Sequence, residues 1–244
     1  MSIEKLSDMI KMSNNIVFFG GAGVSTESNI PDFRSSNGLF SEKLNKEFTP
    51  EQLVSHTFYT KYPYDFYKFY KDKLVYINAK PNKAHFALSN LEKTGKLKAI
   101  ITQNIDGLHQ MAGSKNVLEI HGSIHRNYCT NCNKFFNLKD MLSLDGVIPY
   151  CNNCGGIIKP DVVLYEESLD NELISKTISA ISNSDLLIIG GTSLVVYPAA
   201  SFINYFNGKN IVLINKSKTP YDYKANLVIN DSIGKVLDEV INLI

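Results

Sequence analysis

The sequence predicts an α/β fold, with a doubly wound parallel sheet and a second, smaller domain. Short apolar runs rich in β-branched residues recur along the 244 residues, and amphipathic helical patterns separate them. Two segments interrupt this alternation: one is rich in aromatic residues, and the other contains all four cysteines. A chain of this length that is 44% apolar can bury a sizeable core.

The predicted helices and strands alternate in chain order. The first helix is expected at 2–13, where Ile3, Leu6, Met9 and Ile10 share one helical face. The runs expected to be buried strands are 15–19, 99–102, 117–120, 185–190, 210–214 and 226–229. The other helical patterns are 82–95, 171–182 and 236–244. Alternation of this kind predicts a parallel sheet that binds its ligands at the carboxyl ends of the strands.

The two interrupting segments define the predicted domain organisation. Residues 40–78, which include YPYDFYKFYKDKLVY, are expected to form a helical insert, and residues 126–156 a cysteine-containing module. Together they would form the small domain. The large domain is then discontinuous and comprises residues 1–39, 79–125 and 157–244.

Composition and charge disfavour several classes of partner. The 25 basic and 24 acidic residues form no long run of one sign, so we expect neither nucleic acid nor a membrane as partner. No stretch approaches the ~20 apolar residues that span a bilayer, and the N-terminal residues lack a signal-peptide pattern, so we expect a cytoplasmic protein. Only Arg34 and Arg126 are arginines. Because a guanidinium is a planar fork with fixed donors, we expect Arg34 where geometry matters.

The four cysteines fall in two C-x-x-C pairs, CTNC at 129–132 and CNNC at 151–154. Two such pairs at this separation can present four thiolates tetrahedrally, as structural zinc sites do. We therefore expect Cys129, Cys132, Cys151 and Cys154 to bind one Zn²⁺ and to leave no position for water. The alternatives are a disulfide pair or a redox motif, although a thioredoxin-like motif has a single C-x-x-C beside a βαβ unit.

The run GGAGVST follows the first predicted strand, as a dinucleotide-binding loop does. However, Thr26 occupies its third glycine position, and no acidic residue closes a second strand about 20 residues later. The Gly-Lys-Ser/Thr of a P-loop is also absent, so the run by itself also fits a plain strand-to-helix turn. Its small residues would let backbone N–H groups approach a pyrophosphate, and Ser25 and Thr26 would add donors and a helix cap.

The continuation of this run carries a family resemblance. GAGVSTESNIPDFR (21–34) resembles, almost residue for residue, the first signature of the sirtuins, the Sir2 family of NAD-dependent protein deacylases. Other motifs follow in the family's order: TQNIDGLH (102–109), HG (121–122), the four cysteines, KPDVVLYEE (159–167), GTSLVVYPA (191–199) and LIN (213–215). The resemblance runs from about residue 5 to the C-terminus and is to bacterial members with a four-cysteine zinc ribbon. It implies a Rossmann-like large domain, a small domain of insert and ribbon, and NAD and substrate in the cleft between them.

The resemblance implies an NAD-dependent protein-lysine deacetylase, which transfers the acyl group to ADP-ribose and releases nicotinamide. His121 would be the general base at the ribose, a role that suits an imidazole titrating near neutrality. Asp106 would receive the nicotinamide carboxamide, and Asn104 would orient the ribose and a water. If the strand stays extended there, both side chains point to one side. His125 is expected to be structural. The residues implied to bind NAD are Gly21, Ala22, Gly23, Ser25, Thr26, Ile30, Asp32, Phe33, Arg34, Gln103, Asn104, Ile105, Asp106, His121, Gly191, Thr192, Ser193, Asn215 and Lys216.

The implied partners are acylated protein lysines, bound as an extended peptide between VVLY and LVVY. The residues implied to contact this substrate are Tyr67, Val162, Val163, Leu164, Tyr165 and Val195. Tyr70 occupies the position where desuccinylase-like members carry an arginine, which favours acetyl or longer neutral acyl groups. Helical spacing is expected to turn Lys68 and Lys71 away from the face formed by Tyr67 and Tyr70.

Two departures from the family pattern stand out. Asn29 replaces a usual glycine, and asparagine tolerates a left-handed backbone better than most residues. Tyr165-Glu166-Glu167 replaces Phe-Gly-Glu, which would make the peptide-facing edge more acidic and favour basic flanks in the substrate.

Two other activities stay open at this point: transfer of ADP-ribose to a protein or to water, and deacylation of longer neutral chains. A zinc-ribbon binding module with a regulatory NAD pocket is disfavoured, because a sensor needs no base at the ribose.

Overall fold

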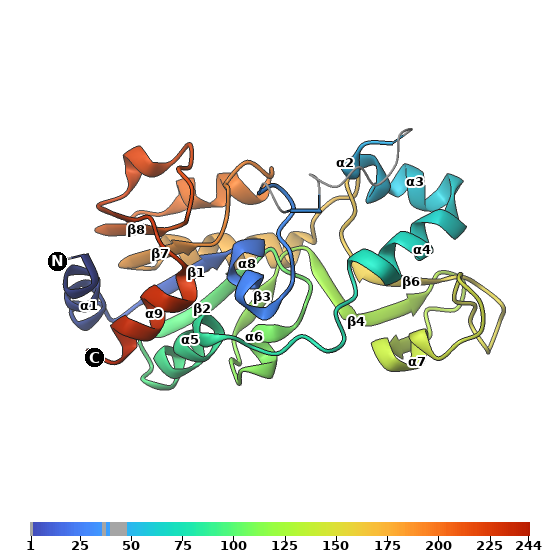
Figure 1. Ribbon diagram of the computed structural model, residues 1–244, viewed down its shortest axis with the longest axis horizontal. Helices are drawn as coiled ribbons and strands as arrows, with labels where there is room; N and C mark the ends of the chain where they lie inside the picture. Colours follow the sequence, from blue (N-terminus) through green and yellow to red (C-terminus); the bar gives the residue numbers. More distant parts are fainter. Residues whose placement is uncertain (1, 36–37, 40–47) are drawn as a thin grey trace.

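The computed structural model describes residues 2–35, 38–39 and 48–244, and its large domain is built on a six-stranded sheet (Figure 1). The strand order is β3-β2-β1-β7-β8-β9. The strands are β1 (Ile16–Gly20), β2 (Leu97–Thr102), β3 (Val117–Glu119), β7 (Leu186–Gly190), β8 (Asn210–Ile214) and β9 (Leu227–Ile229). Each neighbouring pair is parallel. Each predicted run therefore forms a strand of one parallel sheet, and the predicted fold class is confirmed.

Helices cover both faces of this sheet, which is why β1 and β7 are buried at every position. Helices α1 (Ser2–Met12), α5 (Lys83–Lys93) and α9 (Ile233–Ile241) pack on one face, where Leu6 and Leu88 join a hydrophobic core (Figure 1). Helix α8 (Asn171–Ser182) and the 3₁₀ helix η4 (Ala199–Tyr205) cover the other face, where Ile181 and Phe202 form a second core. The sheet is thus doubly wound, as predicted.

The ends of the helices follow local signals. Asp170 accepts a hydrogen bond from the amide of Leu173 at the start of α8, and Asn82 accepts one from Ala84 at the start of α5. The predicted helix at 236–244 is displaced, because Ile233 extends the buried face of α9 towards its N-terminus. The remaining short elements of the large domain are α6 (Leu108–Met111) and the 3₁₀ turns η1 (Ala22–Val24), η2 (Thr26–Ser28) and η5 (Asp222–Lys224).

The small domain joins a helical layer to an antiparallel sheet in the order β5-β4-β6. The helices are α2 (Pro50–Leu53), α3 (His56–Lys61) and α4 (Pro63–Lys73); residues 40–47 of the predicted insert lie outside the described residues. The other elements are β4 (Gly122–Cys129), β5 (Phe135–Asn137), α7 (Leu138–Leu142) and β6 (Ile158–Val162). One aromatic-rich core spans both layers. The ribbon sheet thus extends past both ends of the predicted module at 126–156, since β4 begins at Gly122 and β6 ends at Val162.

The carboxyl ends of three central strands meet beside the small domain. The registers pair Gly20 at the end of β1 with Thr102 on β2 and with Gly190 on β7. The amide of Val163 donates to the carbonyl of His121 at 3.0 Å, which connects β6 to the turn after β3. Ligands of such sheets bind at the carboxyl edge.

Candidate active site and zinc centre

The four cysteine side chains converge at one end of the ribbon. Their Sγ atoms all lie within 4.8 Å of one another, with 3.4 Å between Cys129 and Cys154 and 3.7 Å between Cys132 and Cys151. Sulfurs around a tetrahedral Zn²⁺ with Zn–S bonds of ~2.3 Å would be about 3.8 Å apart, so this donor set fits zinc. The amide of Asn131 points at Cys129 Sγ at 3.4 Å, as it would towards a thiolate. Four thiolates fill the coordination sphere, so the site is suited to a structural metal.

The loop after β1 packs directly on the loop after β7. Gly23 N donates to Gly191 O at 2.8 Å, and a Cβ on Gly23 would lie 2.8 Å from both the Cα and the carbonyl oxygen of Gly191. A Cβ on Gly21 would lie 2.9 Å from Thr192 Cβ. These glycines therefore allow two backbones to meet, and the Gly23 amide is used within the protein. Ala22 lies between them and is half-buried.

The helix expected after this loop does not form. The chain instead makes the 3₁₀ turns η1 and η2, and neither has a side-chain cap. Thr26 Oγ1 donates back to Gly23 O at 3.0 Å. The predicted helix cap from Ser25 and Thr26 is thus wrong, because both hydroxyls are bound elsewhere.

The buried hydroxyl of Ser25 joins Asn104 to Asp106. Ser25 Oγ donates to Asp106 Oδ2 at 2.6 Å and accepts from Asn104 Nδ2 at 3.1 Å, while Asp106 Oδ1 accepts from Leu108 N at 2.9 Å. Burial raises the pKa of Asp106, and the hydrogen bonds from Ser25 and Leu108 oppose part of that rise. Asn104 and Asp106 meet as predicted. Ser25 holds the two side chains together; an extended strand does not, because β2 ends at Thr102.

His121 lies between β3 and β4 and faces the loop after β2. Its Nδ1 is 3.0 Å from Gln103 O. Because a carbonyl only accepts, Nδ1 carries the hydrogen and Nε2 keeps its lone pair. Burial lowers the pKa of His121, so the imidazole is neutral near pH 7. A neutral imidazole with a fixed tautomer can accept a proton at Nε2.

Two more hydrogen bonds connect the segment after His121 to the loop that carries Asp106. Ile124 N donates to Ile105 O at 3.0 Å, and His125 Nε2 donates to Asp106 O at 3.0 Å. The ring of His125 also lies against Gly107, where a Cβ would be 2.6 Å from it. His125 is therefore structural, as predicted, but its contact with the loop of Asp106 carried no signal in the sequence.

Gln103 connects the ends of the central strands. Its Nε2 donates to Thr192 Oγ1 at 3.0 Å, and its backbone amide donates to Gly20 O at 3.0 Å. Ser193 is half-buried in the same loop as Thr192. These contacts bring the predicted residues of β2 and β7 to one place.

The predicted residues after β8 lie further along the same edge of the sheet. Asn215 Nδ2 donates to Ser217 O at 2.7 Å, and Lys216 is exposed. Asn215 therefore shapes its own loop in this structure, and its implied contact with NAD stays a prediction.

The segment from Asn29 follows the path that the sequence predicted. Asn29 has the left-handed angles φ 61° and ψ 26°, which confirms that asparagine supports a backbone conformation suited to glycine. Ile30 N donates to Ser25 O at 3.3 Å. Asp32 Oδ1 accepts from the amides of Arg34 at 3.1 Å and Ser35 at 2.8 Å, so this carboxylate forms a local turn.

Arg34 connects the cofactor loop to the segment implied to bind peptide. Its Nη2 donates to Tyr165 Oη at 3.1 Å. Phe33, beside it, is half-buried. This contact was not foreseen, because it depends on the tyrosine that replaces the family's usual phenylalanine.

The residues implied to contact substrate differ in exposure. Tyr165 and Val195 expose 38% and 44% of their surface. Val162 and Leu164 are buried in the core of the small domain, and Val163 packs against the second core of the large domain. Tyr165 and Val195 are the most accessible of these side chains and Val163 is half-buried, so their contact with substrate stays a prediction.

Tyr67 does not lie where a substrate contact was expected. Its side chain is fully buried, and its hydroxyl donates to Ile158 O at 2.7 Å. Tyr70 is also fully buried, whereas Lys68 is exposed and Lys71 is half-buried, as the helical spacing predicted. Tyr67 therefore fills the small-domain core, where no contact with an acyl group is open to it.

The acidic pair after Tyr165 is bound within the protein. Glu166 has φ 76°, a left-handed angle at the position where the family has glycine, and its Oε2 accepts from Thr57 N at 2.8 Å. Glu167 Oε2 lies 3.1 Å from Lys159 Nζ, and its Oε1 lies 2.8 Å from His56 Nδ1. Because both carboxylates already have partners within the protein, the argument that they favour basic residues beside the substrate lysine is weakened.

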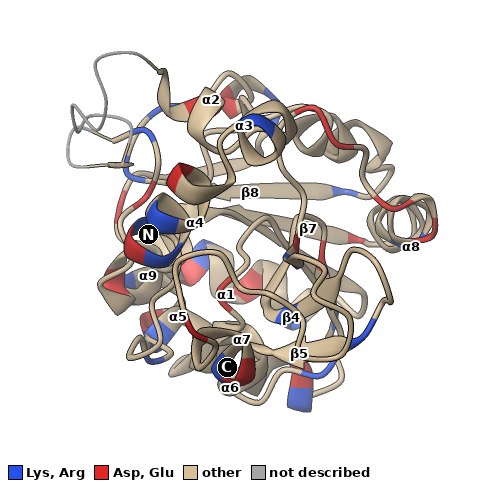
Figure 2. Ribbon diagram, turned by 90° about the vertical axis from the view of Figure 1, so that its right-hand side faces the viewer, with Lys and Arg blue, Asp and Glu red and all other residues tan. Residues whose placement is uncertain are grey.

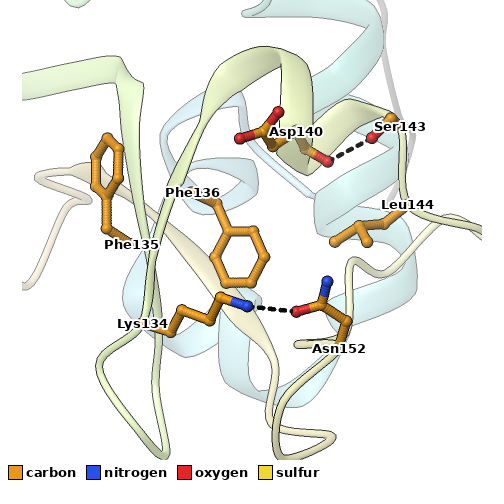
Figure 3. Close-up of a pocket in the computed structure, with 7 residues that line it drawn as sticks. All are labelled: Lys134, Phe135, Phe136, Asp140, Ser143, Leu144 and Asn152. Carbon is orange, nitrogen blue, oxygen red and sulfur yellow. Dashed lines mark hydrogen bonds between the residues drawn. The ribbon is translucent and has the colours of Figure 1, made fainter.

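A separate pocket of about 270 Å³ lies on the ribbon, and no predicted site residue lines it (Figure 3). Lys134 Nζ donates to Asn152 Oδ1 at 2.8 Å and lies 5.3 Å from the centre of the Phe136 ring. Ser143 Oγ donates to Asp140 O at 2.8 Å. These polar groups bind one another, so the pocket offers no evident reactive group.

Charge and hydropathy add two observations. Figure 2, drawn from the side of the small domain, shows basic and acidic segments interspersed over the described chain. Among residues 2–35, 38–39 and 48–244, no helix is both long and apolar enough to cross a bilayer.

The comparisons with known proteins agree with this geometry. The model of the Sir2 family matches residues 21–198. An "NAD-dependent protein deacetylase" of Clostridium perfringens is 69% identical over 98% of both chains, and one of Clostridium tetani is 61% identical over 98% of this chain and 96% of its own. A solved Sir2 structure with deacetylated p53 peptide and 3'-O-acetyl ADP ribose is 35% identical, with a TM-score of 0.92 over 100% of this chain and 98% of that one. A family match over most of the length, with relatives this similar, shows that the chain belongs to the Sir2 family.

Proposed function

We propose that this protein is an NAD-dependent protein-lysine deacetylase, which transfers the acetyl group from acetyl-lysine to ADP-ribose and releases nicotinamide. One observation carries the proposal: a neutral His121 of fixed tautomer lies across from a loop where Ser25 joins Asn104 to Asp106. The relatives that are named NAD-dependent protein deacetylases support it. So do sirtuin structures solved with NAD⁺ or with an acetylated peptide.

His121 provides the base. Bound NAD supplies an electrophilic anomeric carbon, and a ribose hydroxyl must lose its proton for the acyl group to move. His121 Nε2 accepts that proton, while the bond from Nδ1 to Gln103 O orients the ring and stabilises the positive charge that forms.

Asp106 and Asn104 bind and orient. The buried carboxylate of Asp106 accepts the amide N–H of nicotinamide, and Asn104 positions the ribose. Phe33 covers the reacting sugar and excludes water, which would otherwise compete for the anomeric carbon. Arg34 lies between cofactor and peptide, since it already donates to Tyr165 Oη.

The acyl-lysine peptide binds as an extended segment against Tyr165 and Val195. On the side of Tyr165, the amides of Val163, Leu164 and Tyr165 already donate within the protein. Main-chain pairing there would use carbonyl oxygens, of which those of Leu164 and Tyr165 already accept one hydrogen bond each. Acetyl is the favoured acyl group because the similar proteins are named deacetylases, whereas Tyr70 is buried in the small-domain core and does not select the acyl chain.

Zinc would stabilise the ribbon and take no part in the reaction, because four thiolates leave it no open position. A cytoplasmic location fits the zinc site, because a reducing compartment keeps the four cysteines as thiols that can bind the metal.

The test is incubation of the protein with NAD and an acetyl-lysine peptide, with nicotinamide, peptide mass and O-acetyl-ADP-ribose followed together. Nicotinamide, deacetylated peptide and O-acetyl-ADP-ribose should form in equal amounts. Nicotinamide release without loss of acetyl would indicate ADP-ribosyl transfer or NAD hydrolysis instead. Loss of acetyl without NAD would contradict the mechanism. His121→Gln should abolish turnover at unchanged zinc content and melting temperature, and a variant with full turnover would refute the assigned base.

A further inference from the structure

We propose that Arg126 is a positioning residue for this reaction: it fixes the turn that carries His121 and pairs the buried charge of Glu119 beside it. The inference rests on the function proposed above. Arg126 is one of only two arginines in the chain, and the other, Arg34, lies in the cofactor loop.

The guanidinium of Arg126 joins three strands. Its Nη1 donates to Glu119 Oε2 at 2.6 Å, and its Nε donates to Asp161 Oδ2 at 2.7 Å. Glu119 ends β3 of the large sheet, Arg126 lies on β4, and Asp161 lies on β6 of the ribbon sheet. A planar fork can direct separate N–H groups at two carboxylates, whereas the ammonium of a lysine is a single point charge.

These three strands surround the turn between β3 and β4. Gly122, next to His121, has φ 79°, and a Cβ there would lie 1.9 Å from Asp161 O. β4 pairs with β6 at Gly122 and Ser123 and again from Asn127, and the register shifts between Ser123 and Asn127. Arg126 lies in that irregular stretch, where its side chain connects the strands in place of a regular ladder.

Pairing with Arg126 also controls the local charge. The side chain of Glu119 is only 8% exposed, and its negative charge contributes to the raised pKa of Asp106. The other charged or titratable groups around the turn are His125 on β4 and Asp161 on β6. Without Arg126, an unpaired carboxylate would face the loop of Asp106 and the turn of His121. The carboxyl of Asp106 and the imidazole of His121 both act in their deprotonated forms. A nearby unpaired negative charge would raise the pKa of each and so favour its protonated form.

The test is the pH dependence of deacetylation in three variants: Arg126→Met, Arg126→Lys, and Arg126→Met combined with Glu119→Gln. Arg126→Met should lower kcat about tenfold and change the KM for the peptide less than about twofold, because the loss is one of positioning. The acid limb of its kcat/KM profile for NAD should move to higher pH by about half a unit or more. Arg126→Lys keeps the positive charge, so the acid limb of its kcat/KM profile should stay at the wild-type pH. Its kcat should lie between those of Arg126→Met and the wild type. The double variant should also return the limb to the wild-type pH, because the buried charge of Glu119 is gone and the remaining carboxylate, that of Asp161, is 44% exposed and screened by water.

Lys176→Met is the matched control. It breaks the 2.7 Å ion pair with Glu172 on the surface of α8, where the two side chains are 59% and 77% exposed, and it should leave both readouts unchanged. If Arg126→Met fails to fold, as melting and zinc content would reveal, the kcat values of Arg126→Lys and of the double variant decide the question. Both lack the guanidinium fork, so both should fall below wild type, and wild-type kcat in both would overturn the role of Arg126.

If the wild type is active and the pH profile of Arg126→Met matches that of Lys176→Met, the role of Arg126 is overturned while the proposed function stands. A shifted limb that persists in the double variant would have the same consequence. A wild type that releases no nicotinamide in the presence of peptide would instead overturn the proposed function itself.

Discussion

Replacing Ser25 with alanine tests the hydrogen-bonded bridge at the centre of the site. The side chain is 1% exposed, so water cannot take the place of its hydroxyl. The substitution removes the 2.6 Å bond to Asp106 Oδ2 and the 3.1 Å bond from Asn104 Nδ2. A hydrogen bond to a charged group contributes about 1.5–3 kcal/mol, and both partners stay buried. We expect the free energy of unfolding to fall by about 2–3 kcal/mol at pH 8.

This loss of stability should depend on pH. Ser25 stabilises the ionised form of Asp106, so its removal raises the already raised pKa of that carboxyl further. The folded variant therefore binds a proton at higher pH than the folded wild type, and the difference in stability shrinks as the pH falls through the variant's pKa. Urea unfolding followed by circular dichroism at pH 8 and pH 5 measures this difference.

The matched control is Ser175→Ala on α8, where an exposed hydroxyl donates to Asn171 O at 2.9 Å. It should change stability by less than about 0.5 kcal/mol at either pH. The reasoning is refuted if Ser25→Ala costs no more than this control, or if its cost is the same at both pH values.

Three further predictions concern the backbone, the buried histidines and the metal. Gly23→Ala should weaken NAD binding at least about tenfold in calorimetry, because its Cβ would lie 2.8 Å from Gly191 and separate the two loops; wild-type affinity would contradict the packing argument. Burial lowers the pKa of His85 to about 4 and that of His109 to about 3, so both are neutral when folded. The unfolded chain takes up protons below pH ~6.5, so the free energy of unfolding should fall as the pH drops from there towards 4, and His109→Leu should reduce that slope by up to about 1.4 kcal/mol per pH unit; an unchanged slope in urea titrations would refute this. Removal of zinc by a chelator should expose residues 126–156 to limited proteolysis, and a ribbon that resists proteolysis after verified metal loss would contradict a structural metal.

The parallel sheet and the metal site could be predicted because their signals are local. Each strand is a short apolar run that a buried parallel strand requires, and the runs appeared at the observed places within one or two residues. The cysteine spacing likewise limits which donors can converge. The extent of the ribbon sheet was harder to predict from the sequence, because β4 begins at Gly122, directly after His121, and contains no apolar run. The predicted cap on the first loop failed because the hydroxyl of Ser25 had a stronger acceptor that is distant in sequence.

By itself, the sequence determined the fold class, the donor set for zinc and the family, because these depend on residue types at fixed spacings along the chain. The tertiary structure alone decided what several of these residues contact. It placed Ser25 against Asn104 and Asp106, which are 79 and 81 residues away, and it buried Tyr67 where a substrate contact had been expected. It also brought Arg126 to carboxylates on two other strands. The physical reason is that a side chain's partners are selected by the packing of whole strands and helices, and no pattern along the chain records which distant groups that packing brings together.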